Sequence, residues 1–345
     1  MFGLHENANI SCALAETDAL LSTALSLQPK SGGDGGASWD SIIAGLADDI
    51  PSRMPKPYDV EKALLDFPTM YAESMNTVLT QELLRFNRLT TVLMKSLAEI
   101  KRAIAGLVVL SADLEAMGNS MVLGQVPGMW GNAAYPSLKP LGSWVSDLIA
   151  RLAFIQDWVD SLQAPNLYWI SGFYFTQAFL TGTLQNFARK YQIPIDQVAY
   201  DFVVLRPDEQ EKAAARPEDG SVVHGLFADS ARFDVAAHAL AEAHPRELFA
   251  AMPFIHMLPR NVSDLEPVKG HIDLYTIDKT MPPYQGGTCH CYMCPVYKTS
   301  VRFGVLSTTG HSTNFVIMMR IPMAPQHDQK HWVKRGVAML TQLDD

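Results

Sequence analysis

The densest group of reactive side chains in the sequence is "CHCYMC", which places Cys289, His290, Cys291 and Cys294 within six residues. Thiolate sulfur and imidazole nitrogen are ligands that zinc prefers. Consecutive residues cannot easily all turn toward one tetrahedral ion, and no second C-x-x-C or H-x-x-x-H motif completes the set. Zinc binding through Cys289, Cys291 and Cys294 therefore stays an alternative, and free thiols on a loop before a strand are the preferred interpretation. A redox-active cysteine pair is favoured less than either.

No other motif in the sequence points to catalysis. No glycine is followed by lysine, so the phosphate-binding pattern G-x-x-x-x-G-K-[ST] is absent, and neither H-E-x-x-H nor G-x-S-x-G occurs. The glycine-rich "SGGDGG" offers backbone amides without a lysine, so it is interpreted as a linker. We therefore expect this protein to have no enzyme activity and no bound cofactor.

An uncharged aromatic stretch runs from Ser161 to Ala188. It is long enough to cross a bilayer, for which about 20 apolar residues suffice. Polar side chains such as Thr176 and Gln185 are scattered through it, and inside lipid each would need a protein partner. A membrane-associated helical protein stays an alternative, and a buried central helix is preferred.

Length and composition indicate a folded protein of about two domains. The chain has 345 residues, of which 48% are hydrophobic and 18% charged. Its net charge of -9 gives no general attraction to nucleic acid or to an anionic membrane. Four cysteines are too few for a disulfide framework in a protein of this length, so a reducing, cytosolic-type compartment is expected.

Helical periodicity dominates up to about residue 195. An apolar seam from Leu79 to Leu114 predicts a helical strut of ~40 residues, or roughly 60 Å, unless it bends near Gly106. Two further helices are expected over 144–162 and 169–187, packed against this strut. The large side chains predicted to form the core of these helical layers are Trp144, Trp169, Phe173, Leu180, Leu184 and Phe187.

Beyond Pro194 the sequence changes to short, often alternating segments separated by Pro and Gly, which predict five to seven strands. In "PVYKTSVRFGV", alternation predicts a half-buried strand with Lys298 and Arg302 on its exposed face. Asp328 is expected to cap a closing helix, "QKHWVKRGVAMLTQL". The predicted fold class is therefore α+β, with N-terminal helical layers, an antiparallel β-barrel-like domain and a C-terminal helix.

Several long strings resemble a known family. "YPSLKPLGSWVSDLIARLAFIQDWVD", "ISGFYFTQAFLTGTLQNFARKYQIPID" and "CPVYKTSVRFGVLSTTGHSTNFVIMMRIP" are similar to the C-terminal region of dynein heavy chains, and more to axonemal than to cytoplasmic ones. The opening "FGLHENANI" resembles the segment that enters the small helical part of the sixth AAA+ module. The resemblance covers essentially the whole sequence, in order.

The resemblance implies three parts. Residues 1–80 would be the end of the sixth AAA+ module, 81–195 the helical part of the dynein C-terminal domain, and 196–345 its β-barrel part. The 345 residues would then be a fragment of a longer polypeptide whose sites for ATP and Mg lie in other modules.

The implied function is noncatalytic: bracing the AAA+ ATPase ring and modulating the ATP-driven motility of the parent motor on microtubules. The implied partners are the ring modules of the same heavy chain, with other dynein subunits and microtubules met only through the full complex, and no nucleic acid or membrane. The implied location is the cytoplasm, in the axonemal cytoskeleton of a cilium or flagellum. Lys298 and Arg302 are candidates for docking on the ring, with a merely solvated strand face as the alternative.

Overall fold

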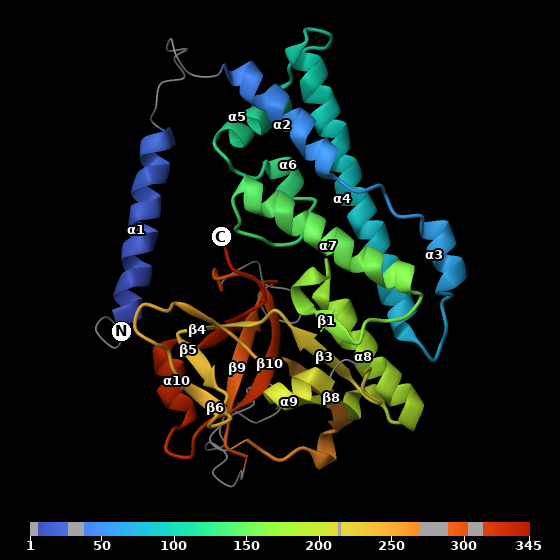
Figure 1. Ribbon diagram of the computed structural model, residues 1–345, viewed down its shortest axis with the longest axis vertical. Coiled ribbons are helices and arrows are strands. Elements are labelled where there is room, and N and C mark those ends of the chain that lie inside the picture. Colours follow the sequence, from blue (N-terminus) through green and yellow to red (C-terminus); the bar gives the residue numbers. More distant parts are fainter. Residues whose placement is uncertain (1–5, 27–37, 213–214, 269–288, 303–312) are drawn as a thin grey trace.

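The computed structural model describes residues 6–26, 38–212, 215–268, 289–302 and 313–345 of the protein. Helices dominate the first part and strands the second, so the predicted α+β class is confirmed (Figure 1). The helices are α1 (Glu6–Ser26), α2 (Trp39–Arg53), α3 (Val60–Asp66), α4 (Ser74–Ile104), α5 (Ala112–Val122), α6 (Gly128–Gly131), α7 (Leu141–Ser161), α8 (Thr176–Tyr191), α9 (Pro207–Lys212) and α10 (Gln329–Arg335). The strands are β1 (Leu167–Trp169), β2 (Val198–Val204), β3 (Ser221–His224), β4 (Phe227–Asp229), β5 (Ala231–Asp234), β6 (Ala239–Glu242), β7 (Phe249–Ala251), β8 (Ile255–Asn261), β9 (Cys291–Tyr297), β10 (Phe315–Pro322) and β11 (Ala338–Leu340).

The longest helix, α4, runs through the helical half and contacts α2, α3, α7 and α8 (Figure 1). Most of its predicted apolar seam is buried, namely Leu79, Leu83, Phe86, Leu93, Leu97 and Ile100. The backbone N–H groups of Gly106 and Leu107 donate to the carbonyls of Ala103 and Arg102, at 3.0 and 2.9 Å, and Gly106 has a φ of 72°. These bonds close the end of a helix, and the left-handed conformation suits glycine. The strut therefore ends at this glycine, and α5 is a separate helix.

The prediction of one helix over 169–187 is wrong. Leu167–Trp169 form the short strand β1, a single 3-10 turn follows over Ile170–Gly172, and α8 begins only at Thr176. β1 pairs in parallel with β3, which lies far along the sequence in the β half. Strand pairing with β3 replaces the predicted helical turn because aromatic residues and glycine have only a weak preference for helix.

The predicted core residues divide into two groups. Trp144, Phe173 and Leu180 are buried, as expected. Trp169, Leu184 and Phe187 are only half-buried. None of the helices in the described part of the protein is long and apolar enough to cross a membrane.

The described strands form three sheets, with strand orders β1-β3-β8-β2, β10-β9-β11-β4-β7 and β5-β6. Most neighbours are antiparallel, as predicted, but β1–β3 and β9–β11 are parallel. The first of these parallel pairs adds a strand from the helical half to the edge of a sheet of the β half. The predicted domain boundaries at residues 80 and 195 stay predictions; residue 80 lies inside α4, and residue 195 begins a single 3-10 turn, Ile195–Gln197, that leads into β2.

The strand predicted over 295–305 is shorter at its C-terminal end than expected. β9 ends at Tyr297, and the amide of Asn314 then donates to the Thr299 hydroxyl at 3.1 Å and also to the Val301 carbonyl. These side-chain bonds hold the backbone in a bend, which competes with strand pairing. Residues 303–305 of the prediction lie outside the described residues.

The closing helix is also shorter than predicted. Asp328 does cap it, since its carboxylate accepts from the N–H of His331 at 2.8 Å. α10 ends at Arg335, Gly336 caps it with a φ of 69°, and the backbone continues as β11 between β9 and β4. Ala338, Met339 and Leu340 are all buried there, so a central strand position outweighs the helical pattern.

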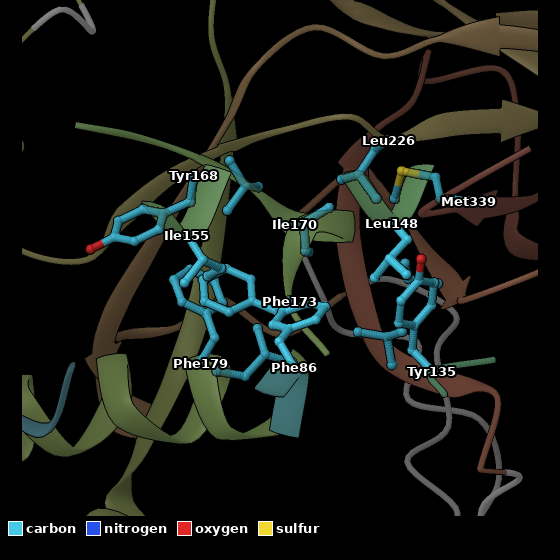
Figure 2. Packing of buried hydrophobic residues seen from close by; sticks show 14 of the residues in the cluster. Phe86, Tyr135, Leu148, Ile155, Tyr168, Ile170, Phe173, Phe179, Leu226 and Met339 are labelled. Carbon is cyan, nitrogen blue, oxygen red and sulfur yellow. The ribbon is translucent and has the colours of Figure 1, made fainter. Parts of the chain in front are cut away.

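The hydrophobic core joins both halves (Figure 2). The Phe173 ring stacks on Phe179 with centroids 4.6 Å apart, and the centroid of Phe179 lies 4.9 Å from that of Tyr168. Leu226 and Met339, from the β half, belong to the same cluster. Offset and stacked ring pairs add about 0.5 to 1.5 kcal/mol each beyond the burial of their area.

Candidate functional site

The junction between the helical and β halves is built around Arg151 of α7, which is 3% exposed. Its Nε donates to Oδ2 of Asp147, one helical turn earlier, at 2.6 Å. Its Nη2 donates to Ser171 Oγ and to Gln342 Oε1, both at 3.1 Å, and its Nη1 to the Phe173 carbonyl at 3.3 Å. One guanidinium thus connects α7, the segment after β1 and the residues that follow β11.

Aromatic rings complete the surroundings of this guanidinium. Its central carbon lies 3.8 Å from the centroid of Tyr135 and 5.5 Å from that of Trp169. The Tyr135 hydroxyl also donates to Asp147 Oδ2 at 2.9 Å. A buried charge is tolerated only where its hydrogen bonds and counter-charge are supplied, and here both are present.

A second buried charge, Glu82 of α4, holds the start of α8. Its carboxylate accepts from the backbone N–H groups of Tyr174 and Phe175 at 2.5 and 3.1 Å, and from Arg85 Nη1 at 3.3 Å. Burial raises the pKa of Glu82 from 4.5 to about 6, and the two backbone hydrogen bonds partly offset that rise. The negative charge also lies where a helix N-terminus favours it.

Neither Arg151 nor Glu82 was predicted from the sequence to be a functional residue. A signal exists for both, because Arg151 lies three residues after Leu148, on the buried face of α7, and Glu82 directly precedes Leu83 within the buried face of α4. A charged residue on a buried helical face needs a specific partner. The identity of that partner depends on contacts between distant segments.

The proposed docking residues Lys298 and Arg302 do not lie on an exposed strand face, so that prediction is wrong. Both are half-buried and follow the end of β9. Lys298 lines the same small cavity as Arg151, and burial lowers the pKa of its amine. Arg302 donates to the Gly336 carbonyl at 2.5 Å and forms an ion pair with Asp229. Lys298 and Arg302 are therefore not exposed as expected. Their docking on ring modules stays a prediction.

The three cysteines of the proposed zinc site do not converge. Cys289 Sγ donates to Cys291 Sγ at 3.2 Å, but Cys294 is buried on the opposite face of β9. Burial raises the pKa of both the Cys291 and Cys294 thiols, which disfavours the thiolates that zinc requires. Within the described ranges, no group of three or more His, Cys, Asp and Glu side chains is placed to hold a metal ion.

A polar cavity of about 390 Å³ opens between the start of α4 and the end of α8. Its charged lining residues are paired within the protein. Lys190 contacts Asp219 at 2.8 Å, Arg216 contacts Glu73 at 3.5 Å, and Arg189 donates to Ser74 Oγ at 2.7 Å. The cavity therefore presents hydrogen-bonded charges of both signs.

The turn between α4 and α5 carries exposed apolar residues. Leu107 is 71% exposed, Val109 91% and Leu110 40%. Single exposed apolar residues are common, but several close together at the tip of a long helix indicate a contact surface. We call Leu107, Val109 and Leu110 the α4–α5 tip.

The described part of the protein combines a helical layer with mixed sheets, and Arg151 ties the two together. The protein belongs to the family of C-terminal domains of dynein heavy chains, whose family model matches residues 14–341.

Its similarity is to axonemal members of that family. It is 46% identical over 347 residues to rat "Dynein axonemal heavy chain 1", 46% over 345 residues to mouse "Dynein axonemal heavy chain 3", and 45% over 347 residues to mouse "Dynein axonemal heavy chain 12". All of the present sequence is covered in each case, but only 7%, 8% and 10% of those proteins.

Proposed function

We propose that this protein is a noncatalytic domain that braces the AAA+ ring of an axonemal dynein heavy chain and modulates its ATP-driven movement along microtubules. Family membership and similarity to axonemal heavy chains over the full length of the sequence support this proposal. Its partners would be ring modules of the same heavy chain. Other subunits and microtubules would be reached through the complete motor in the axoneme of a cilium or flagellum.

The observation that carries the bracing role is the Arg151 junction. A brace transmits force only if its parts do not shift against each other, and close-packed interiors transmit strain well. Arg151 forms hydrogen bonds that join three separate segments. In addition, apolar side chains of both halves pack together in one hydrophobic cluster. The helical and β halves therefore form one stiff body.

The α4–α5 tip is the surface we assign to ring contact. Leu107 and Val109 are its most exposed members, and burying residues of this size contributes about 1.5 to 3 kcal/mol each. The tip lies at the end of α4 that is farther from the β half (Figure 1). The longest helix would therefore transmit force between the tip and the β half.

A complementation experiment tests this assignment. A dynein heavy chain lacking this domain is mixed with the 345-residue protein, and microtubule-stimulated ATPase activity is measured. We expect the unaltered protein to change the rate toward that of the intact motor, and a Leu107→Asp/Val109→Asp variant to have no effect. Val333→Asp, on exposed Val333 of α10, is the matched control and should act like the unaltered protein.

Two outcomes would overturn the proposal. If the double variant complements as well as the control, the tip is not the contact surface. If the purified protein hydrolyses ATP by itself, the domain is not noncatalytic.

A further inference from the structure

We propose that Cys289 and Cys291 are an oxidation site, at which a hydroperoxide converts the two thiols into a reversible intramolecular disulfide. Their sulfur atoms are 3.2 Å apart, and both side chains are partly exposed. Residues two apart in an extended segment point to the same side, which accounts for the contact. This site is independent of the bracing function proposed above.

The backbone around the pair is held on both sides, which keeps the sulfur atoms together. Cys289 forms a bridge with Val268, and the carbonyl of His290 accepts from Met323 N–H at 3.0 Å. The carbonyl of Cys291 accepts from the Gln329 amide at 2.6 Å. A preorganised pair loses little conformational freedom when the bond forms.

The other two cysteines are poorly placed to compete. Cys294 is buried on the opposite face of β9, with its sulfur 3.8 Å from the Pro295 carbonyl. Cys12 lies on α1, where its thiol contacts Glu16 at 3.6 Å. Disulfide formation should therefore be confined to the 289–291 pair.

The chemistry proceeds in two balanced steps. The Cys289 thiolate attacks the peroxide oxygen, giving a sulfenic acid and releasing the alcohol, or water from hydrogen peroxide. The Cys291 sulfur then attacks the sulfenic sulfur and forms the S–S bond; the sulfenic oxygen leaves as one water with the proton of the Cys291 thiol. Two electrons pass from the thiols to the peroxide. Burial and the neighbouring thiol raise the pKa of Cys291, so Cys289 is assigned the first step.

The spacing makes this disulfide easy to reduce. Cα atoms two residues apart in a strand are separated by about 6.6 Å, near the upper limit for an unstrained disulfide. Strained or exposed disulfides have higher reduction potentials and are readily cleaved by dithiols, and both of these side chains are partly exposed. The site is therefore suited to reversible modification.

Mass spectrometry of the 345-residue protein tests the proposal. The reduced protein is treated with hydrogen peroxide, alkylated and digested. We expect the peptide containing Cys289 to Cys294 to lose the mass of two hydrogen atoms and to carry one alkyl group, on Cys294. Dithiothreitol should restore alkylation of all three thiols. Cys294→Ser is the matched control and should still form the disulfide.

Cys289→Ser and Cys291→Ser should each abolish the loss of two hydrogen atoms, and Cys291→Ser should yield a dimedone adduct on Cys289. Persistence of the disulfide in either variant would overturn the assignment of the pair. So would an unaltered protein that gains only oxygen atoms at these cysteines.

Discussion

At the scale of single residues, the junction depends on side chains whose surroundings make them sensitive to substitution. Phe173 is 2% exposed and contacts the rings of Phe154, Trp158, Tyr168 and Phe179, whereas its near neighbour in sequence Phe175 is 42% exposed. Two phenylalanines only two residues apart therefore experience opposite environments.

We expect Phe173→Asp to unfold the helical half, because it buries a charge without a partner and removes a core ring. The loss should exceed about 4 kcal/mol. Phe175→Asn is the control and should change the melting temperature little, since asparagine before α8 is a favourable cap and adds no charge beside Glu82. Thermal melting followed by circular dichroism checks both, and an unchanged curve for Phe173→Asp would contradict the packing described.

Glu82 makes the stability of the protein depend on pH. Its folded-state pKa of about 6 lies above the ordinary 4.5, so its contribution to stability is fully present below pH 4.5 and is lost as pH rises through 6. A shift of this size corresponds to about 2 kcal/mol.

Urea unfolding of the unaltered protein and of Glu82→Gln between pH 4.5 and 7 measures this contribution. We expect the unfolding free energy of the unaltered protein, relative to that of the variant, to fall by about 2 kcal/mol across that range. A difference that stays constant with pH would show that Glu82 titrates normally.

At the scale of elements, glycines decide where helices end. Gly106 follows α4 with a φ of 72°, whereas Gly45 lies within α2, and a Cβ would meet nothing within 4 Å at either position. The two sites therefore differ in backbone conformation and not in available space.

Alanine at these two positions should have opposite effects. Gly106→Ala should destabilise the protein by about 1 kcal/mol, because the left-handed conformation is strained for alanine. Gly45→Ala should stabilise it by about 0.5 to 1 kcal/mol, since alanine favours a helix interior. Chemical denaturation measures both, and the same sign for both would contradict the helix end at Gly106.

At the scale of the whole molecule, the two halves share β1, the Arg151 contacts and one hydrophobic cluster. Hydrogen exchange in α4 and in β8 should therefore report similar opening free energies in the unaltered protein. An independent unfolding of the two halves would argue against a single stiff body.

Arg151→Met should weaken this coupling. Removing one partner of a buried ion pair costs about 3 to 5 kcal/mol, because Asp147 is left without its counter-charge. We expect faster hydrogen exchange in the residues after β11, where Gln342 loses its bond to the guanidinium. Arg53→Met, which removes an exposed ion pair with Asp49, is the control and should leave exchange there unchanged.

The amino-acid sequence alone predicted the α+β class, the family, the cap at Asp328 and the buried seam of α4. These features follow from local spacing and from long matching strings, since residues three and four apart share a helix face and capping is a contact between near neighbours.

Packing in three dimensions is what makes 167–169 and 338–340 strands, turns Lys298 toward the junction, and lets Glu82 and Arg151 hold distant segments together. The reason is that strand pairing and the neutralisation of buried charge depend on partners far away in the sequence. A pattern of neighbours along the sequence indicates that a residue will be buried, but the partner it meets is set by how the elements pack.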